Sequence, residues 1–207
     1  MDISEFNPYV SNFNKQTFNI STEEVYAVGN AMMEAAKKGG RLHFCGVGKT
    51  SYVAGYAAAL ISSTGITSYS LDATEVAHGS AGQLGPNDVV VFISNSGETS
   101  ETLKALMVTK AKSNNTPGFD IKTVSITKKN SSLGKLTDFC INAEVEDEGG
   151  PWNKAPRKSI NLENSIIQLL SIYLQLESKF TKRDYLLNHS SGSIGKSLEA
   201  EAYLDAK

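Results

Sequence analysis

Two short loops rich in glycine and hydroxyl residues have the composition of an anion-binding site. The first is Gly46–Ser51, read GVGKTS, and the second is Ser94–Thr99, read SNSGET. Each follows a short apolar run and precedes a helical pattern, where the first N–H groups of a helix lack partners and the helix dipole is positive. Ser94, Ser96 and Thr99 could add hydroxyl donors to a phosphate. Such residues are also ordinary helix caps, so one loop alone does not decide between the two interpretations.

The letters GKT in the first loop also end the P-loop motif of nucleotide-binding proteins. That motif needs a glycine five positions before its second glycine, and His43 occupies this position, inside the apolar run. The loop is therefore too short to wrap a triphosphate, which disfavours ATP or GTP. A monophosphate needs fewer amides, and Gly48, Thr50 and Ser51 at the start of a helix are enough to hold one.

Four further side chains could move protons or stabilise charge, and each has a simpler structural interpretation. Lys49, in the first loop, could be a solvated lysine. Glu98 could be an acid at a helix start that forms a capping box with Asn95. Glu148 is one of four acids within five positions, where a solvated turn is the simpler interpretation. His189 lies in a Gly/Ser-rich loop, where a histidine is more often structural or exposed than catalytic.

The elements that would position these residues are predicted by hydrophobic pattern. Apolar runs predict strands over Arg41–Cys45, Thr67–Leu71, Val89–Ile93, Ile121–Ile126 and Phe139–Ile141. Helical patterns cover Thr50–Ser63, Ala73–Gln83, Ser100–Lys112 and Ser131–Leu136. An earlier helix is capped by Ser21 or Thr22 and ends at Lys37, Lys38 and Gly39. This alternation favours an α/β fold, a doubly wound five-stranded parallel sheet with the flavodoxin-like order 2-1-3-4-5. Its first and third strands would be neighbours at the topological switch point, so the two polar loops would meet there.

The regions that flank the sheet differ from it in character. Residues 1–18 form a polar N-terminal arm, and residues 180–207 form a C-terminal tail that carries the histidine loop. A helix over Ser159–Lys179 is apolar on most sides, which predicts burial, and a subunit interface is a natural partner for such a helix. We therefore expect residues 1–207 to form a single domain that assembles at least as a homodimer.

Composition excludes several classes of protein. The chain has 207 residues, 40% of them hydrophobic, and a net charge of −2 without a sustained basic block, which disfavours nucleic acid as a partner. No apolar run reaches the roughly 18 residues of a membrane span, and the N-terminus does not resemble a signal peptide. Cys45 and Cys140 lie in apolar runs and are expected to be reduced core residues of a cytoplasmic protein. No His/Cys cluster predicts a metal site.

Five stretches of the chain resemble the sugar isomerase (SIS) domain family, and within it the arabinose 5-phosphate isomerases. They read CGVGKTSYVAG, EVAHGSAG, DVVVFISNSGETSETL, VEDEGGPWNKAP and NHSSGSIG. They occur in the order and spacing of the family, and SNSGET is specific to it when it follows a strand. Because the chain ends at residue 207, we expect it to lack the paired CBS regulatory domains of many relatives.

The resemblance implies a role for individual residues. The residues implied in binding the substrate and its phosphate are Gly48, Thr50, Ser51, His78, Ser94, Asn95, Ser96 and Thr99. The residues implied in catalysis are Lys49, Glu98, Glu148 and His189. Family members assemble as dimers and tetramers in which the histidine segment reaches a neighbouring subunit, so a homodimer or homotetramer with shared sites is expected.

The resemblance implies a phosphosugar aldose–ketose isomerase that acts through an enediol or enediolate, with no metal or organic cofactor. Glu148 is the first choice for the base that moves the proton from C2 to C1. His189 would serve ring opening or proton transfer to oxygen, Lys49 would stabilise negative charge, and Glu98 would orient hydroxyl groups.

Three departures from the family pattern bear on the identity of the sugar. Arg157 and Lys158 stand where the isomerases carry small hydroxyl residues, Ser80 stands for an acidic residue, and Ser190 for a proline. The alternative function is a non-catalytic sugar-phosphate sensor. Such regulators usually carry a helix-turn-helix domain before the sheet, and the 40 residues that precede the first predicted strand are too few for one.

Overall fold

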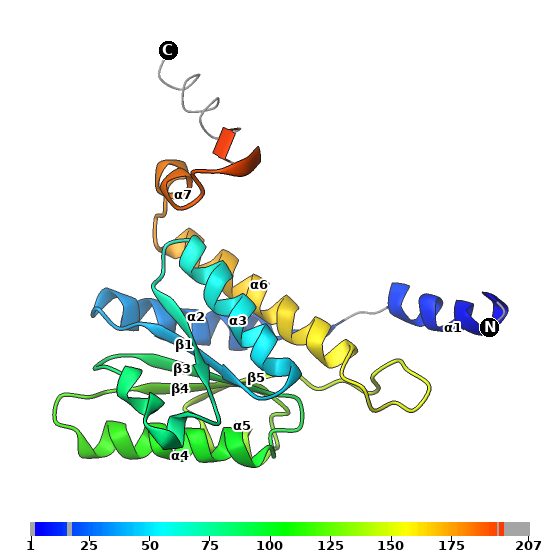
Figure 1. The fold of residues 1–207 in the computed structure, drawn as a ribbon, viewed down its shortest axis with the longest axis horizontal. Helices are drawn as coiled ribbons and strands as arrows, with labels where there is room; N and C mark the ends of the chain where they lie inside the picture. Colours follow the sequence, from blue (N-terminus) through cyan, green and yellow to red (C-terminus); the bar gives the residue numbers. More distant parts are fainter. Residues whose placement is uncertain (1–2, 16–17, 194, 197–207) are drawn as a thin grey trace.

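A five-stranded parallel sheet forms the centre of the molecule. The computed structural model describes residues 3–15, 18–193 and 195–196, and Figure 1 shows the fold. The strands are β1 (Leu42–Gly46), β2 (Ser68–Asp72), β3 (Val89–Ser94), β4 (Lys122–Thr127) and β5 (Phe139–Asn142). Their order is β2-β1-β3-β4-β5, and all neighbouring pairs are parallel. The predicted doubly wound order is confirmed.

Helices cover both faces of this sheet (Figure 1). One face carries α2 (Thr22–Lys37), α3 (Lys49–Ser63) and α6 (Lys158–Glu177), and the other carries α4 (Ser100–Asn115) and α5 (Ser132–Leu136). The core divides in the same way, because successive side chains of a strand point to opposite faces. In β3, Val89, Val91 and Ile93 belong to the first core, whereas Val90 and Phe92 belong to the second. Burial on both faces explains why this run lacks polar alternation.

The expected helix over Ala73–Gln83 is wrong in type. Two 3₁₀ turns, η1 (Val76–His78) and η2 (Ser80–Gln83), occupy this segment. Gly79 separates them with φ of 119°, a left-handed conformation that interrupts an α-helix and suits a residue without a Cβ. The other predicted elements are present, and their ends differ from the predicted ones by at most three residues.

Two further helices, α1 (Ile3–Asn14) and α7 (Lys182–Asn188), lie at the ends of the described chain (Figure 1). The segment that carries α7 packs on the last turn of α3. The Phe180 ring lies so close to Gly65 that an added Cβ there would clash with it, and the Asn188 amide donates to the Ser63 carbonyl at 3.2 Å. The organisation of residues 1–207 as one domain stays a prediction. Across the described residues, no helix has the length and apolar character needed to cross a membrane.

Candidate functional site

The loops after β1 and β3 leave the sheet at the same edge. Gly46 pairs with Ile93, so the two strands end together. The N-caps of the helices that follow, Gly48 for α3 and Thr99 for α4, make no side-chain cap hydrogen bond. Side chains do cap α2, α5 and α7. No N-cap side chain therefore occupies the first N–H groups of α3 and α4, although the Ser51 N–H of α3 donates to the Gly48 carbonyl at 3.2 Å. The positive N-terminal ends of these two helices follow adjacent strands.

The hydroxyl groups of the first loop shape the loop itself. The Thr50 hydroxyl donates to the Val47 carbonyl at 3.0 Å and accepts from the Val47 N–H at 3.0 Å. The Ser51 hydroxyl donates to the Gly48 carbonyl at 2.6 Å. Gly48 has φ of 64°, in the left-handed region. An anion at this loop would therefore meet backbone N–H groups, with Thr50 and Ser51 holding the loop in place.

The second loop is closed by its own serine and threonine side chains. The Ser94 hydroxyl lies 3.1 Å from the Thr99 hydroxyl and accepts from the Gly97 N–H at 3.2 Å. The Ser96 hydroxyl, which is exposed, accepts from the Glu98 N–H at 3.2 Å. These hydrogen bonds turn the chain back on itself between β3 and α4. A loop that wraps a small anion needs such a curled shape.

Glu148 is buried, so the interpretation of this acid as part of a solvated turn is wrong. Only 7% of the residue is exposed. Its carboxylate accepts from the Asn95 amide at 3.1 Å and from the N–H groups of Arg157 and Ser159 at 2.6 and 3.2 Å. The Glu148 N–H in turn donates to the Asn153 side chain. One carboxylate thus caps the start of α6 and is tied through Asn95 to the SNSGET loop.

Lys49 and Glu98 lie at the two loops but differ in where they are held. Lys49 is exposed as the first residue of α3. Glu98 is also exposed, and its carboxylate accepts from the Ser132 N–H at 2.7 Å, at the start of α5. This hydrogen bond lowers the pKa of Glu98. Glu98 is therefore turned toward the α5 side of the sheet and is not joined to Glu148.

The two predicted histidines lie at the end of η1 and at the end of α7. His78 is exposed at the end of η1. His189 is the C-cap of α7, where its ring stacks on Tyr185 at 4.0 Å between centroids. Glu148 holds the first turn of α6, whereas α7 follows its last turn, and a helix of 20 residues is about 30 Å long. Within one subunit, His189 and Glu148 are therefore at opposite ends of α6. Figure 1 shows α7 beyond the C-terminal end of α6.

The side chains of Arg157 and Lys158, the departures from the family pattern, bind groups in or near the segment before α6. The Lys158 ammonium pairs with Asp147 at 2.8 Å and reaches Asn12 of α1 at 3.0 Å. This pairing lowers the pKa of Asp147. The Arg157 guanidinium donates to the Ala155 carbonyl at 3.3 Å. Neither side chain takes the place of a candidate phosphate-binding group in Gly46–Ser51 or Ser94–Thr99.

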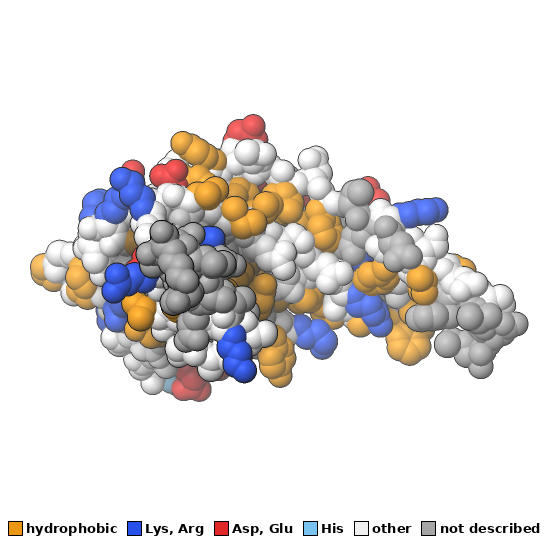
Figure 2. Space-filling view, turned by 90° about the horizontal axis from the view of Figure 1, so that it is seen from above, with side chains coloured by type: hydrophobic (Ala, Val, Ile, Leu, Met, Phe, Trp, Pro, Cys, Tyr) orange, Lys and Arg blue, Asp and Glu red, His pale blue; other side chains and the backbone are white. Residues whose placement is uncertain are grey.

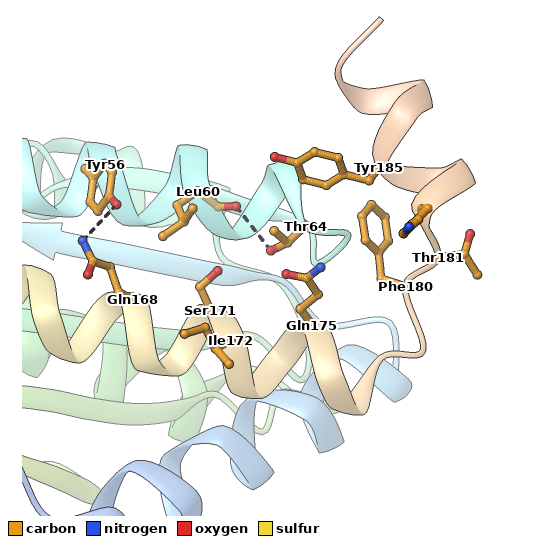
Figure 3. Close-up of a pocket in the computed structure, with 11 residues that line it drawn as sticks. Tyr56, Leu60, Thr64, Gln168, Ser171, Ile172, Gln175, Phe180, Thr181 and Tyr185 are labelled. Atoms are coloured by element: carbon orange, nitrogen blue, oxygen red, sulfur yellow. Dashed lines mark hydrogen bonds between the residues drawn. The ribbon is translucent and has the colours of Figure 1, made fainter. Parts of the chain in front are cut away.

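A separate groove of about 550 Å³ lies between α3, α6 and α7 (Figure 3). It is lined by Tyr56, Leu60, Thr64, Gln168, Ser171, Ile172, Gln175, Phe180, Thr181, Lys182 and Tyr185. This groove is near the C-terminal ends of α3 and α6, whereas the loops and Glu148 are at their N-terminal ends. It is therefore not the candidate site. Within the described part of the chain, no group of three or more His, Cys, Asp or Glu side chains is placed to hold a metal ion.

One acid beside Glu148 was not predicted from the sequence. Glu163 is fully buried on α6, and neither of its carboxyl oxygens has a hydrogen-bond partner. Burial, and secondarily the charge of Glu148, raises its pKa to about 8. The signal was present in the sequence, because Glu163 lies in the apolar stripe of α6 with Leu162, Ile166 and Leu170.

The fold and the site define a class of protein, a doubly wound α/β protein with two uncapped helix starts and a buried carboxylate at its switch point. The SIS domain matches residues 36–172. The chain belongs to the SIS domain family.

Individual relatives support this assignment. An uncharacterized protein of Helicobacter pylori is 34% identical over 176 residues, covering 84% of this chain and 51% of the relative. The arabinose 5-phosphate isomerase KpsF of Escherichia coli is 32% identical over 160 residues, covering 77% of this chain and 48% of the relative. The structure of an E. coli CFT073 protein in complex with arabinose 5-phosphate matches with a TM-score of 0.74 at 28% identity, covering 90% of this chain and 96% of that one. The chain spans about half the length of the curated relatives.

Proposed function

We propose that this protein is a phosphosugar aldose–ketose isomerase whose substrates are arabinose 5-phosphate and ribulose 5-phosphate or close analogues. The observation that carries the proposal is the position of Glu148, a buried carboxylate fastened by Asn95 to the SNSGET loop. A phosphate held at that loop would bring the sugar carbons to this carboxylate. The named function of KpsF and the sugar phosphate bound to the E. coli CFT073 protein support the substrate class. Reaction in the cytoplasm is proposed too, where the free thiols of Cys45 and Cys140 stay reduced.

Binding of the phosphate would rely mainly on backbone N–H groups. The starts of α3 and α4 offer such groups together with the positive ends of two helix dipoles. The exposed Ser96 hydroxyl and the half-buried Thr99 hydroxyl can turn toward the anion, since both are bonded only within the loop. Ser94 is buried, and its hydroxyl holds the loop together through its bonds to Gly97 and Thr99.

Proton transfer would fall to Glu148. Its carboxylate removes the C2 proton of the open-chain aldose, leaving an enediolate, and returns the proton to C1. The negative charge that develops on the sugar oxygens would be stabilised by Lys49, the cation at the first loop. Glu98 would orient the sugar hydroxyls, with its Oε1 accepting from the Ser132 N–H.

The histidine of the reaction would come from a second subunit. His189 and Glu148 lie at opposite ends of α6 in one chain. On α6, Leu169, Ile172 and Leu176 are 42%, 55% and 76% exposed, which is unusual for large apolar side chains and suits a subunit contact. A homodimer or homotetramer that shares its sites would bring His189 of one subunit to Glu148 of another.

A coupled assay over pentose and hexose phosphates tests this function. The native protein is expected to interconvert at least one aldose–ketose pair and, in deuterium oxide, to place deuterium at C2 of the recovered aldose. Absence of turnover with every sugar phosphate, combined with a rise in melting temperature on adding one of them, would favour the sugar-phosphate sensor instead.

A further inference from the structure

Glu163 presents a buried ionisable group that the proposed reaction does not yet use. It lies one turn after Ser159 on α6, on the side of the helix that also carries Ile166 and Leu170, and it is 0% exposed. The strand side chains on this face of the sheet are apolar, among them Phe44 and Ile93. A carboxyl group in such surroundings is rare unless it is paired or used for function.

Polar atoms without partners collect around Glu148. The Asn95 amide and the Ser159 N–H donate to the Glu148 carboxylate. Yet the Asn95 carbonyl oxygen, the Ser159 hydroxyl and both Glu163 oxygens are buried without a hydrogen-bond partner. Buried polar atoms are normally satisfied, so several together mark a place that a water, a proton or a ligand group completes.

Hydrogen bonds distinguish the two buried carboxyls. Glu148 accepts three of them, from Asn95, Arg157 and Ser159. Glu163 accepts none, and burial together with the charge of Glu148 raises the pKa of Glu163. Two like charges in one buried site disfavour each other, so the proton of the pair resides on Glu163.

The charged side chains beside Glu148 in the segment before α6 have their own partners, Lys158 with Asp147 and Arg157 with the Ala155 carbonyl. The ionisable side chains of α2 and α3, the helices packed on α6, are exposed or half-buried: Glu23, Glu24, Tyr26, Glu34, Lys37, Lys49, Tyr52 and Tyr56. Glu148 is the charged group that acts on Glu163, and burial is the larger cause of its raised pKa.

We propose that Glu163 is a positioning residue that stays protonated beside Glu148, so that the pair carries one negative charge and Glu148 is the carboxylate that accepts the substrate proton. This proposal rests on the proposed isomerase function and deepens it. Ionisation of Glu163 would add a second negative charge near the enediolate and oppose its formation. The turnover number is therefore expected to fall above about pH 8, with a limiting slope of about tenfold per pH unit for a single ionisation.

The carboxyl pair can be tested without any turnover. Infrared difference spectra of the full chain between pH 5 and 10 should show a protonated carboxyl at neutral pH that is lost in Glu163→Gln. The titration of that carboxyl should move to lower pH in Glu148→Gln, because the neighbouring charge is removed while Glu163 itself is untouched. The matched control is Glu177→Gln, an exposed acid on the same helix, which should change neither signal. The proposal is overturned if Glu163 is ionised at neutral pH, or if its titration is the same in Glu148→Gln as in the native protein.

The link to the reaction is tested by the pH profile of kcat. Glu163→Gln should abolish the alkaline fall, since an amide stays neutral throughout, and Glu177→Gln should retain it. An alkaline fall that persists in Glu163→Gln overturns the link. If the native chain isomerises no sugar phosphate, the proposed function fails, whereas the infrared titration still decides whether the carboxyl pair exists.

Discussion

At the scale of single residues, the Glu148 carboxylate serves two purposes at once. It accepts from the N–H groups of Arg157 and Ser159, in the manner of an N-cap, and from the Asn95 amide of the SNSGET loop. The same group is the proposed base. Anchoring by three donors gives the carboxylate one orientation, which is what a base needs if it is to meet a specific C–H bond.

Replacing Glu148 by Gln should lower kcat by about 10²- to 10⁴-fold, the usual contribution of a general acid–base group. The affinity for inorganic phosphate should change little, because the phosphate would be held by the two loops. The control is Glu146→Gln, an exposed acid two positions earlier, which should retain kcat. Steady-state kinetics and phosphate titration give both quantities, and near-native turnover of Glu148→Gln would transfer the role of base to Glu98 or His189.

Stability should depend on pH through Glu163. Its pKa rises from 4.5 to about 8 on folding, so between these values the folded protein holds a proton that the unfolded chain has lost. The contribution of this group is fully present below pH 4.5 and is lost as the pH rises toward 8. The free energy of unfolding should fall by about 1.4 kcal/mol per pH unit in this window from Glu163 alone.

Urea unfolding of the native protein and of Glu163→Gln at pH 5, 6, 7 and 8 measures this dependence. The variant should lose the Glu163 component of the slope and become more stable than the native protein at pH 8. Parallel pH profiles for the two proteins would show that Glu163 is ionised in the folded state.

At the scale of elements, strands were the most predictable part of the chain. Val89–Ile93 is apolar throughout because β3 is buried on both faces, so local pattern and tertiary position agree. The segment Ala73–Gln83 failed because a single left-handed Gly79 divides it, and pattern does not reveal φ. The site was predictable where it follows strand ends. The apolar stripe of α6 could have indicated that Glu163 is buried, but its position beside Glu148 depends on how α6 packs. The direction of Glu98 depends on the position of α5.

The SNSGET loop should bind the phosphate but not perform chemistry. Changing Ser96 to Ala together with Thr99 to Val removes the hydroxyls that can turn toward the anion, and KM should rise with a smaller effect on kcat if the contact is equally strong in ground and transition states. Ser100→Ala, which removes an exposed hydroxyl bonded to Glu101, is the control. An unchanged affinity for the sugar phosphate would place the phosphate elsewhere.

The tight turn of this loop depends on Gly97. Its φ is 68°, and an added Cβ would clash with the Ser131 side chain. Gly118 has a similar φ of 80° but open space around it. Gly118→Ala should therefore cost about 1–2 kcal/mol from conformation alone, and Gly97→Ala about 1–3 kcal/mol more from overpacking. Chemical denaturation compares the two, and equal losses would mean that the Ser131 side chain moves aside without strain.

At the scale of the whole molecule, one face carries large apolar side chains that are exposed to solvent. Figure 2 shows hydrophobic side chains gathered on the face seen from above, and α3 and α6 contribute Tyr52, Tyr56, Leu169, Ile172 and Leu176 to the exposed apolar residues. Burying a Leu or Ile side chain stabilises an association by about 1.5–3 kcal/mol. Several such side chains at a symmetric contact are enough to hold a dimer.

Light scattering at micromolar concentration should therefore report at least a dimer. Ile172→Glu should shift the population toward monomer, because it places charge in the apolar contact. Met107→Glu is the control, since Met107 is similarly exposed, at 56%, but on α4 across the sheet. A native protein that is monomeric under these conditions would exclude the shared site.

Mixing inactive variants tests whether the sites are shared. If Glu148 of one subunit works with His189 of another, a mixed dimer of Glu148→Gln and His189→Ala chains has one site with both native groups, and activity should return after subunit exchange. Exchange of either variant with itself is the control. No recovery in a mixture shown to contain mixed dimers would mean that each subunit works alone.

The unpartnered carboxyl of Glu163 also has a consequence for how the protein persists in a cell. A group that weakens the folded state at neutral pH raises the fraction of chains exposed to proteases, and a change of about 1–2 kcal/mol can alter abundance several-fold. Substitutions at position 163 would then increase the amount of protein while lowering its activity. A library of variants can be scored once for abundance and once for growth that depends on the product made by the enzyme. Substitutions at position 163 should rank high in the first score and low in the second, as expected for a residue retained for activity at the expense of stability.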